Sequence, residues 1–192
     1  MNIFKKKKSI RKIYYHEDDY CQQQFLPIEN QEWVNDELKN LGKFSDKHKS
    51  ESGFGWNEIY VGKDPTISLA DLKITAEEVS IVLTQVLPVY DLVFTGYSTY
   101  REKCESTSAW GLNPNCAIFL NWDEKQLVKN IWTNFFDIED DSIITASGAA
   151  ESLGRLRPLF YVDWAWGYSS TLDDAEEFAK QLRAKLKALR EV

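Results

Sequence analysis

Short strand-like segments alternate irregularly with amphipathic helical stretches along this chain. The strand-like segments are rich in aromatic and β-branched residues and cover 10–15, 20–26, 56–61, 91–97, 115–122 and 157–166. Apolar residues recur at helical spacing over 33–41, 75–87, 123–135 and 173–189. This irregular order predicts an α+β fold in which a mostly antiparallel sheet is covered by helices on one side.

The sequence also indicates where these elements end and how they are connected. The acidic run at 17–19 resembles a turn, so the segments 10–15 and 20–26 are expected to form a β-hairpin. Gly42 is expected to end the helix that precedes it, because glycine favours the C-terminal boundary of a helix. The polar stretch 98–114 is expected to be a loop.

Capping-box patterns mark the start of two helices. Thr75 is followed three residues later by Glu78, and Asp173 is followed by Glu176. In such a box the first side chain accepts a hydrogen bond from the backbone of the fourth residue, and the fourth side chain reciprocates. These two helices are therefore the best defined by local sequence.

The chain is expected to form one domain. Its 192 residues contain 43% hydrophobic and 28% charged residues, which is enough apolar material for a single core. No linker rich in proline, glycine or serine divides it. The prediction is a flexible basic arm over 1–9 followed by a single α+β domain over 10–192.

Composition also bears on location. The longest apolar runs are far shorter than the roughly 20 residues that span a bilayer, and no apolar segment follows the N-terminal lysines to complete a signal peptide. The three cysteines form an odd set without metal-ligand spacing. These features predict a cytoplasmic protein with reduced thiols and no membrane partner.

Charge is distributed unevenly. The formal net charge is -7, yet residues 1–12 carry six lysines and arginines and no acid. The rest of the chain is therefore strongly acidic, and an acidic body repels nucleic acids and anionic lipid surfaces. We expect no nucleic-acid partner, and we expect a basic protein partner instead.

Histidines and cysteines are the residue types most typical of thiol catalysis and of zinc sites. The chain has two histidines and three cysteines, namely His16, His48, Cys21, Cys104 and Cys116. They lie in no zinc-binding spacing and in no local motif that pairs a thiol with a base. We therefore expect no metal, no cofactor and no enzymatic activity.

Acidic residues cluster beside aromatic ones in three segments. We predict that a partner is bound by Glu17, Asp18, Asp19, Asp137, Glu139, Asp140, Asp141, Trp164 and Trp166. Aromatic anchors within a charged rim are typical of protein-binding surfaces. The acids at 139–141 precede the strand-like pair Ile143-Ile144, so we expect them on an exposed connection.

The acidic, tryptophan-rich character of the chain, together with the segment 13–22, resembles the immunity proteins of bacterial contact-dependent growth inhibition and related polymorphic toxin systems. The resemblance implies a cytoplasmic inhibitor that binds one cognate toxin domain, often a nuclease, and blocks its active site. It carries over no motif residue by residue. The alternative is a small-molecule-binding or enzymatic α+β domain in which the aromatic residues line a pocket.

Overall fold

The computed structural model describes residues 9–50, 57–136 and 138–190, and it has the predicted α+β fold. The larger sheet has the order β5-β6-β7-β2-β8-β9, with all neighbours antiparallel. Its strands are β2 (Gln23–Pro27), β5 (Thr107–Asn113), β6 (Cys116–Trp122), β7 (Val128–Phe135), β8 (Leu159–Asp163) and β9 (Tyr168–Thr171). The basic arm predicted at 1–9 lies, except for Ser9, outside the described residues.

A smaller sheet has the order β1-β3-β4, and β1 runs parallel to β3. Its strands are β1 (Lys12–Tyr14), β3 (Leu92–Thr95) and β4 (Glu102–Lys103). The helices are α1 (Gln31–His48), α2 (Ala76–Thr84), α3 (Asp140–Leu156) and α4 (Ala175–Arg190), with short 3₁₀ helices η1 (Glu17–Asp19), η2 (Ile28–Asn30) and η3 (Leu69–Leu72). No helix in the described ranges is long and apolar enough to cross a bilayer.

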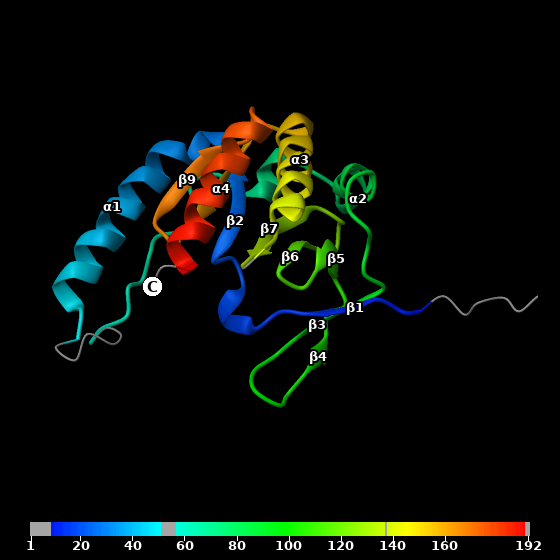
Figure 1. The fold of residues 1–192 in the computed structure, drawn as a ribbon, viewed down its shortest axis with the longest axis horizontal. Coiled ribbons are helices and arrows are strands. Elements are labelled where there is room, and N and C mark those ends of the chain that lie inside the picture. The colour runs from blue at the N-terminus through cyan, green and yellow to red at the C-terminus, as the bar shows by residue number, and fades with distance from the viewer. Residues whose placement is uncertain (1–8, 51–56, 137, 191–192) are drawn as a thin grey trace, which may run out of the picture.

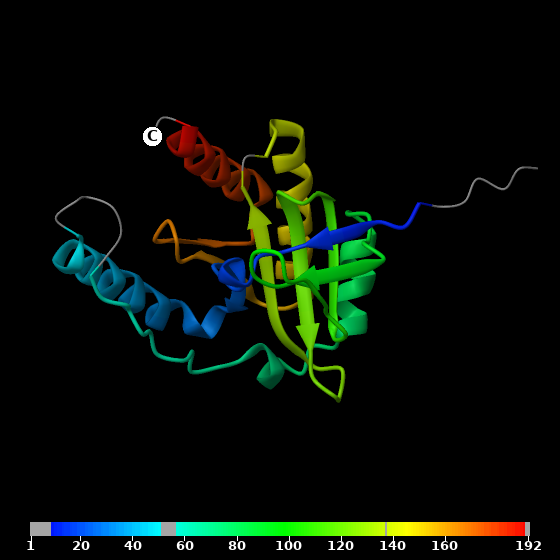
Figure 2. The ribbon, with the colours of Figure 1, turned by 90° about the horizontal axis from the view of Figure 1, so that it is seen from below.

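Both faces of the larger sheet are covered (Figures 1 and 2). Ile131 and Trp132 are neighbours in β7, so their side chains point to opposite faces. Ile131 packs in the core beneath α2, α3 and α4, and Trp132 packs in a second cluster beneath the smaller sheet. On that second face α1 covers β2 and β8, where Val34 packs with Val162. The prediction that all helices lie on one side is therefore wrong for α1.

The predicted β-hairpin at the N-terminus is also wrong. Strand β1 pairs with β3, whereas β2 lies between β7 and β8 in the larger sheet, and η1 connects the two sheets. Strand β2 is a central strand with Phe25 fully buried, so it forms its ladders with two distant strands rather than with its sequence neighbour. Both strands were predictable from composition, but their partners were not.

Helix α1 extends beyond its predicted end. It passes through Gly42, which costs only about 1 kcal/mol in a helix interior relative to alanine. The added turn is stabilised by Phe44, whose ring stacks on His48 with centroids 4.4 Å apart. The strand predicted at 56–61 is absent over 57–61, and Trp56 lies outside the described residues.

Three further predictions are wrong in the middle of the chain. The stretch predicted as a helix at 123–135 contains β7, and the predicted loop at 98–114 contains β4 and β5. A strand such as β7, whose two faces are both covered, has no clean alternation of apolar and polar residues, and periodicity alone cannot distinguish it from a helix. The strand-like pair Ile143-Ile144 lies within α3.

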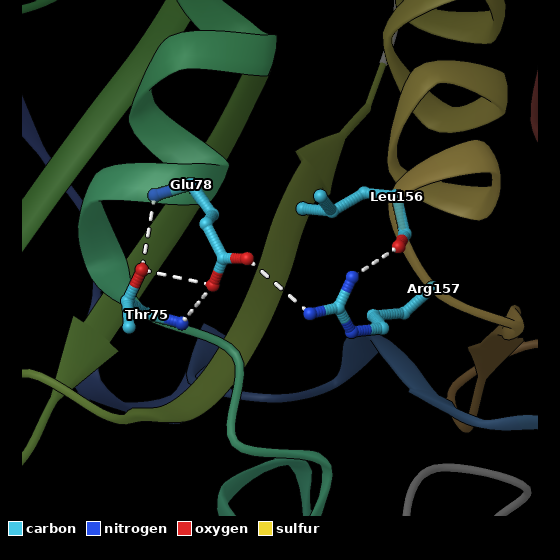
Figure 3. A network of polar contacts seen from close by, with 4 residues as sticks. All are labelled: Thr75, Glu78, Leu156 and Arg157. Carbon is cyan, nitrogen blue, oxygen red and sulfur yellow. Dashed lines mark hydrogen bonds and ion pairs between the residues drawn. The ribbon is translucent and has the colours of Figure 1, made fainter.

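The capping box of α2 is confirmed (Figure 3). Thr75 Oγ1 accepts a hydrogen bond from the Glu78 amide at 3.2 Å, and Glu78 Oε2 accepts one from the Thr75 amide at 2.8 Å. The other carboxylate oxygen of Glu78 lies 3.2 Å from Arg157 Nη2, and Arg157 Nη1 donates to the carbonyl of Leu156 at 2.8 Å. The box thus joins the start of α2 to the end of α3.

Helix α4 begins one residue later than the sequence pattern indicates. Asp174, not Asp173, is its cap, because Asp174 Oδ1 accepts hydrogen bonds from the amides of Glu176 and Glu177 at 2.9 and 3.1 Å. The predicted helix itself is confirmed.

Candidate functional site

The three acidic and aromatic segments predicted from the sequence lie at one end of the larger sheet. Strand β2 pairs with β7 through Gln24 and Trp132 and with β8 through Gln23 and Asp163, so β2 begins at the end where β7 and β8 finish. Three connections leave this end from adjacent strands: η1, the link from β7 to α3, of which 136, 138 and 139 are described, and residues 164–167. We call this region the acidic end of the sheet.

The first connection is η1. Glu17 and Asp18 are exposed and Asp19 is partly exposed. His16 caps η1, since its Nδ1 accepts a hydrogen bond from the Asp18 amide at 3.2 Å. The amide of Glu17 donates to the carbonyl of Gly96 at 3.4 Å, which places η1 against the loop between β3 and β4.

That loop carries two exposed tyrosines, Tyr97 and Tyr100, which no sequence pattern predicted as part of a binding surface. The His16 ring lies edge-on to Tyr97, with centroids 5.1 Å apart. Gly96 has a φ of 140°, and a Cβ atom there would lie 2.2 Å from the carbonyl oxygen of Tyr100, so the loop requires glycine. Exposed tyrosines beside carboxylates extend the acidic end toward the smaller sheet.

The second connection leads into α3. Glu139 is the N-cap residue of α3, while Asp140 and Asp141 form its first turn rather than an exposed connection to a strand. All three are exposed, and Asp140 Oδ1 lies 3.7 Å from Arg183 Nε of α4. Acidic side chains stabilise a helix N-terminus, so part of this acidity has a local structural role. Asp137 lies outside the described residues.

The third connection is the turn between β8 and β9. The Trp164 amide donates to the Gln22 carbonyl at 2.9 Å, so the turn lies beside the residues that follow η1. The Trp164 ring packs edge-on against Trp33 of α1, with centroids 5.9 Å apart. Trp166 is 39% exposed, and its amide donates to Asp163 Oδ1 at 3.0 Å.

A buried ion pair lies beneath this turn. Asp163 ends β8 and Lys185 lies on α4, and their side chains are 0% and 3% exposed. Burial lowers the pKa of Lys185, and the carboxylate of Asp163 acts in the opposite direction. The ammonium group also lies 3.5 Å from the Phe135 carbonyl and 5.6 Å from the centre of the Phe136 ring. The pair therefore links α4 to both β7 and the tryptophan turn.

An aromatic groove opens beside the same turn. Its volume is about 570 Å³, and its walls are α1, residues 58–60 and the turn 164–167. Apolar side chains dominate the lining, with Leu38, Leu41, Phe44, Ile59, Tyr60, Trp164 and Trp166 contributing. A hollow of about 470 Å³ continues from it and shares Leu41, Tyr60 and Trp164. Tyr60 is fixed by a hydrogen bond to Glu37 at 2.7 Å.

The thiols are poorly suited to nucleophilic chemistry. Burial raises the pKa of Cys21 to about 12 and that of Cys116 to about 11, and it also raises the pKa of Cys104. A nucleophilic cysteine needs a lowered pKa, because the thiolate is the reactive form. Within the described ranges, His, Cys, Asp and Glu side chains form no group of three or more that could hold a metal ion.

Comparison with protein families, with characterised proteins and with solved structures found no match to this chain.

Proposed function

We propose that this protein is a stoichiometric inhibitor that binds a basic protein, as an immunity protein binds its toxin domain. The observation that carries the proposal is the convergence of three acidic and aromatic connections from adjacent strands β7, β2 and β8. The proposed surface comprises Glu17, Asp18, Asp19, Glu139, Asp140, Asp141, Trp164 and Trp166, with Tyr97 and Tyr100 beside it.

The two kinds of side chain would have different roles in binding. The carboxylates would speed the encounter with a basic partner, and their charge would occupy positions where a nuclease binds phosphates. The exposed aromatic rings would provide the desolvated centre of the interface and slow dissociation. We place this activity in the cytoplasm, where the three free cysteines would stay reduced.

The aromatic groove favours a second candidate function, the binding of a small apolar ligand. A volume of about 570 Å³ lies within the range of ligand pockets, and Tyr60 and Glu37 provide polar groups in the adjoining hollow. The largely apolar lining of the groove also suits a protein side chain. Screening for ligands that raise the melting temperature would distinguish this candidate from the first.

The first proposal is tested by capture of partners from the native host at low salt, followed by charge reversal. We expect Glu17→Lys with Asp18→Lys to weaken binding to a captured basic protein by several kcal/mol in total, because like charges would then face each other. Asp140→Lys with Asp141→Lys should also weaken binding, and in addition destabilise α3 slightly.

The matched control is Glu77→Lys with Glu124→Lys. It makes the same charge change at exposed positions, with Glu124 in the turn between β6 and β7 at the opposite end of the sheet. Binding should change much less in this variant. Equal losses in all three variants would show that only net charge matters, and the proposed surface would be wrong.

A further inference from the structure

The chain after α1 returns beside the whole length of that helix (Figures 1 and 2). The amide of Asn57 donates to the carbonyl of His48 at 2.9 Å, and ten residues later the Ile67 amide donates to Asn30 Oδ1 at 3.0 Å. The helix between these two points is about 27 Å long at 1.5 Å per residue. The returning chain therefore rises about 2.7 Å per residue, close to the 3.3 Å of a β-strand.

We call residues 58–66 the extended segment. Its backbone makes no hydrogen bond with any other residue in the described ranges. Over residues 59–61 its side chains alternate, since Ile59 and Val61 are 88% and 85% exposed whereas Tyr60 turns inward to Glu37, and residues 61–64 are all exposed. An extended backbone with free polar groups and exposed β-branched side chains is a template for an added strand.

The aromatic groove lies along this segment. Ile59 and Tyr60 of the segment line it together with Trp164 and Trp166 of the turn after β8. Apolar side chains of an added strand would therefore have aromatic surfaces to pack against.

Charge indicates which strand would fit. The charged side chains that line the groove and its adjoining hollow are Glu37, Glu58, Lys63 and Asp64, three acids and one base. A basic segment complements this lining. Outside its basic residues 1–12, a second copy of this chain is strongly acidic and would instead bring like charges together.

We infer that the extended segment binds an extended stretch of a partner protein as an added β-strand. Main-chain hydrogen bonds to residues 59–62 would hold the stretch, its apolar side chains would enter the aromatic groove, and its basic side chains would lie near Glu58 and Asp64. This inference rests on the proposed function, because it takes the partner to be a basic protein.

The direct test uses three short fluorescein-labelled peptides and fluorescence anisotropy. The first alternates valine with lysine, the second replaces lysine with glutamate, and the third is the first with methyl groups on all of its backbone amide nitrogens. We expect the first to bind about tenfold more tightly than either of the others. Equal binding of the methylated peptide would overturn strand addition, because methylation removes main-chain donors and keeps the charge.

Proline variants of the protein provide an independent test. The amides of Val61 and Gly62 point to opposite edges of an extended chain, and neither donates a hydrogen bond within the described ranges. Val61→Pro and Gly62→Pro should therefore leave the melting temperature nearly unchanged. We expect only one of them to reduce binding of the valine-lysine peptide about tenfold, with Val61→Ala and Gly62→Ala as controls.

Equal effects of the two prolines, whether a loss or none, would overturn the inference. So would a concentration-dependent dimer that Val61→Pro or Gly62→Pro abolishes, because the segment would then bind a second copy. If the peptides fail to bind while a captured basic protein binds normally, strand addition is wrong and the proposed function stands. If the valine-lysine peptide binds but no basic protein is captured, strand addition stands and the proposed function is wrong.

Discussion

Two polar contacts join distant parts of this molecule in contrasting ways. At the corner of α2 and α3, Glu78 meets Arg157, and these side chains are 37% and 36% exposed. Beneath the tryptophan turn, Asp163 meets Lys185, and both are almost fully buried. Water screens the first pair, so this pair contributes little to the stability of the fold. In the second pair the loss of either charge would leave the other buried without a counter-ion, which would destabilise the fold.

The same contrast appears in the pKa values. The pKa of Glu78 is lowered first by the amide and hydroxyl of Thr75 and only then by Arg157, so this carboxylate is held by its own helix cap. The pKa of Lys185 is lowered by burial against the opposing effect of Asp163. A local motif, the capping box, positions the Glu78 carboxylate of the first pair. The packing of α4 against β8 brings together the charges of the second pair.

The largest predicted effect is the loss of one buried charge. We expect Lys185→Met to destabilise the protein by about 3 to 5 kcal/mol, because the carboxylate of Asp163 would remain buried without a counter-ion. Urea denaturation would measure this change. Asp163→Asn keeps an acceptor for the Trp166 amide, and combined with Lys185→Met it should cost less than the sum of the two single changes. Additive costs would mean that the two charges do not stabilise each other.

Elements with a local signal were predictable from the sequence. The Thr75 and Glu78 box marks the start of α2, and the apolar stripe marks α4, because each signal lies within one helix. Strands β1 and β2 were predicted as segments but given the wrong partners, since pairing depends on strands more than 60 residues away. Strand β7 was predicted as a helix because no regular alternation marks it.

The candidate site was predictable only in part. The acidic runs and the two tryptophans stand out in the sequence, but their convergence follows from the strand order. Lys185 lies three residues after Leu182 and beside Leu186, on the apolar stripe of α4. A lysine on that stripe is a signal of a buried charge, and this signal was missed. Asp163 likewise interrupts the apolar run of β8. A strand was predicted at 56–61, which overlaps the extended segment only over 58–61, and the fold leaves that part without a partner strand among the described residues.

The second prediction concerns alkaline pH. Burial raises the pKa of Cys21 and Cys116 to about 12 and 11, so the unfolded chain loses these protons at lower pH than the folded chain. The unfolded state then binds fewer protons, and stability falls as pH rises above about 9, by about 1.4 kcal/mol per thiol and pH unit. The lowered pKa of Lys185 gives a slope of opposite sign between its folded value and that of a free lysine.

Urea denaturation between pH 8 and 10.5 would measure this slope. The variant Cys21→Ser with Cys116→Ala should show a flatter dependence, whatever its stability at neutral pH. An unchanged slope would assign the alkaline sensitivity to other buried groups, such as Tyr161, whose pKa is also raised by burial.

The third prediction removes the local cap. Thr75→Ala should cost about 1 kcal/mol, because the Glu78 amide loses its acceptor, while Thr75→Ser should restore most of it. The lowered pKa of Glu78 means that its contribution is present above the pKa of a free carboxyl group and is lost as pH falls through the folded value. Thermal melts between pH 3 and 7 should therefore show a weaker acid dependence for Thr75→Ala.

The smallest predicted effect is that of the exposed pair itself. Arg157→Ala should cost at most about 1 kcal/mol, and the cost should fall as salt is added. Arg155→Ala is a matched control, because Arg155 is 74% exposed and its Nη2 lies 2.7 Å from Glu151 within α3. Similar small losses in both variants would confirm that the α2–α3 corner depends on its cap. If Arg157→Ala instead costs nearly as much as Lys185→Met, and salt does not change that cost, the ion pair between Glu78 and Arg157 would itself hold this corner, as the buried pair holds α4 to β8.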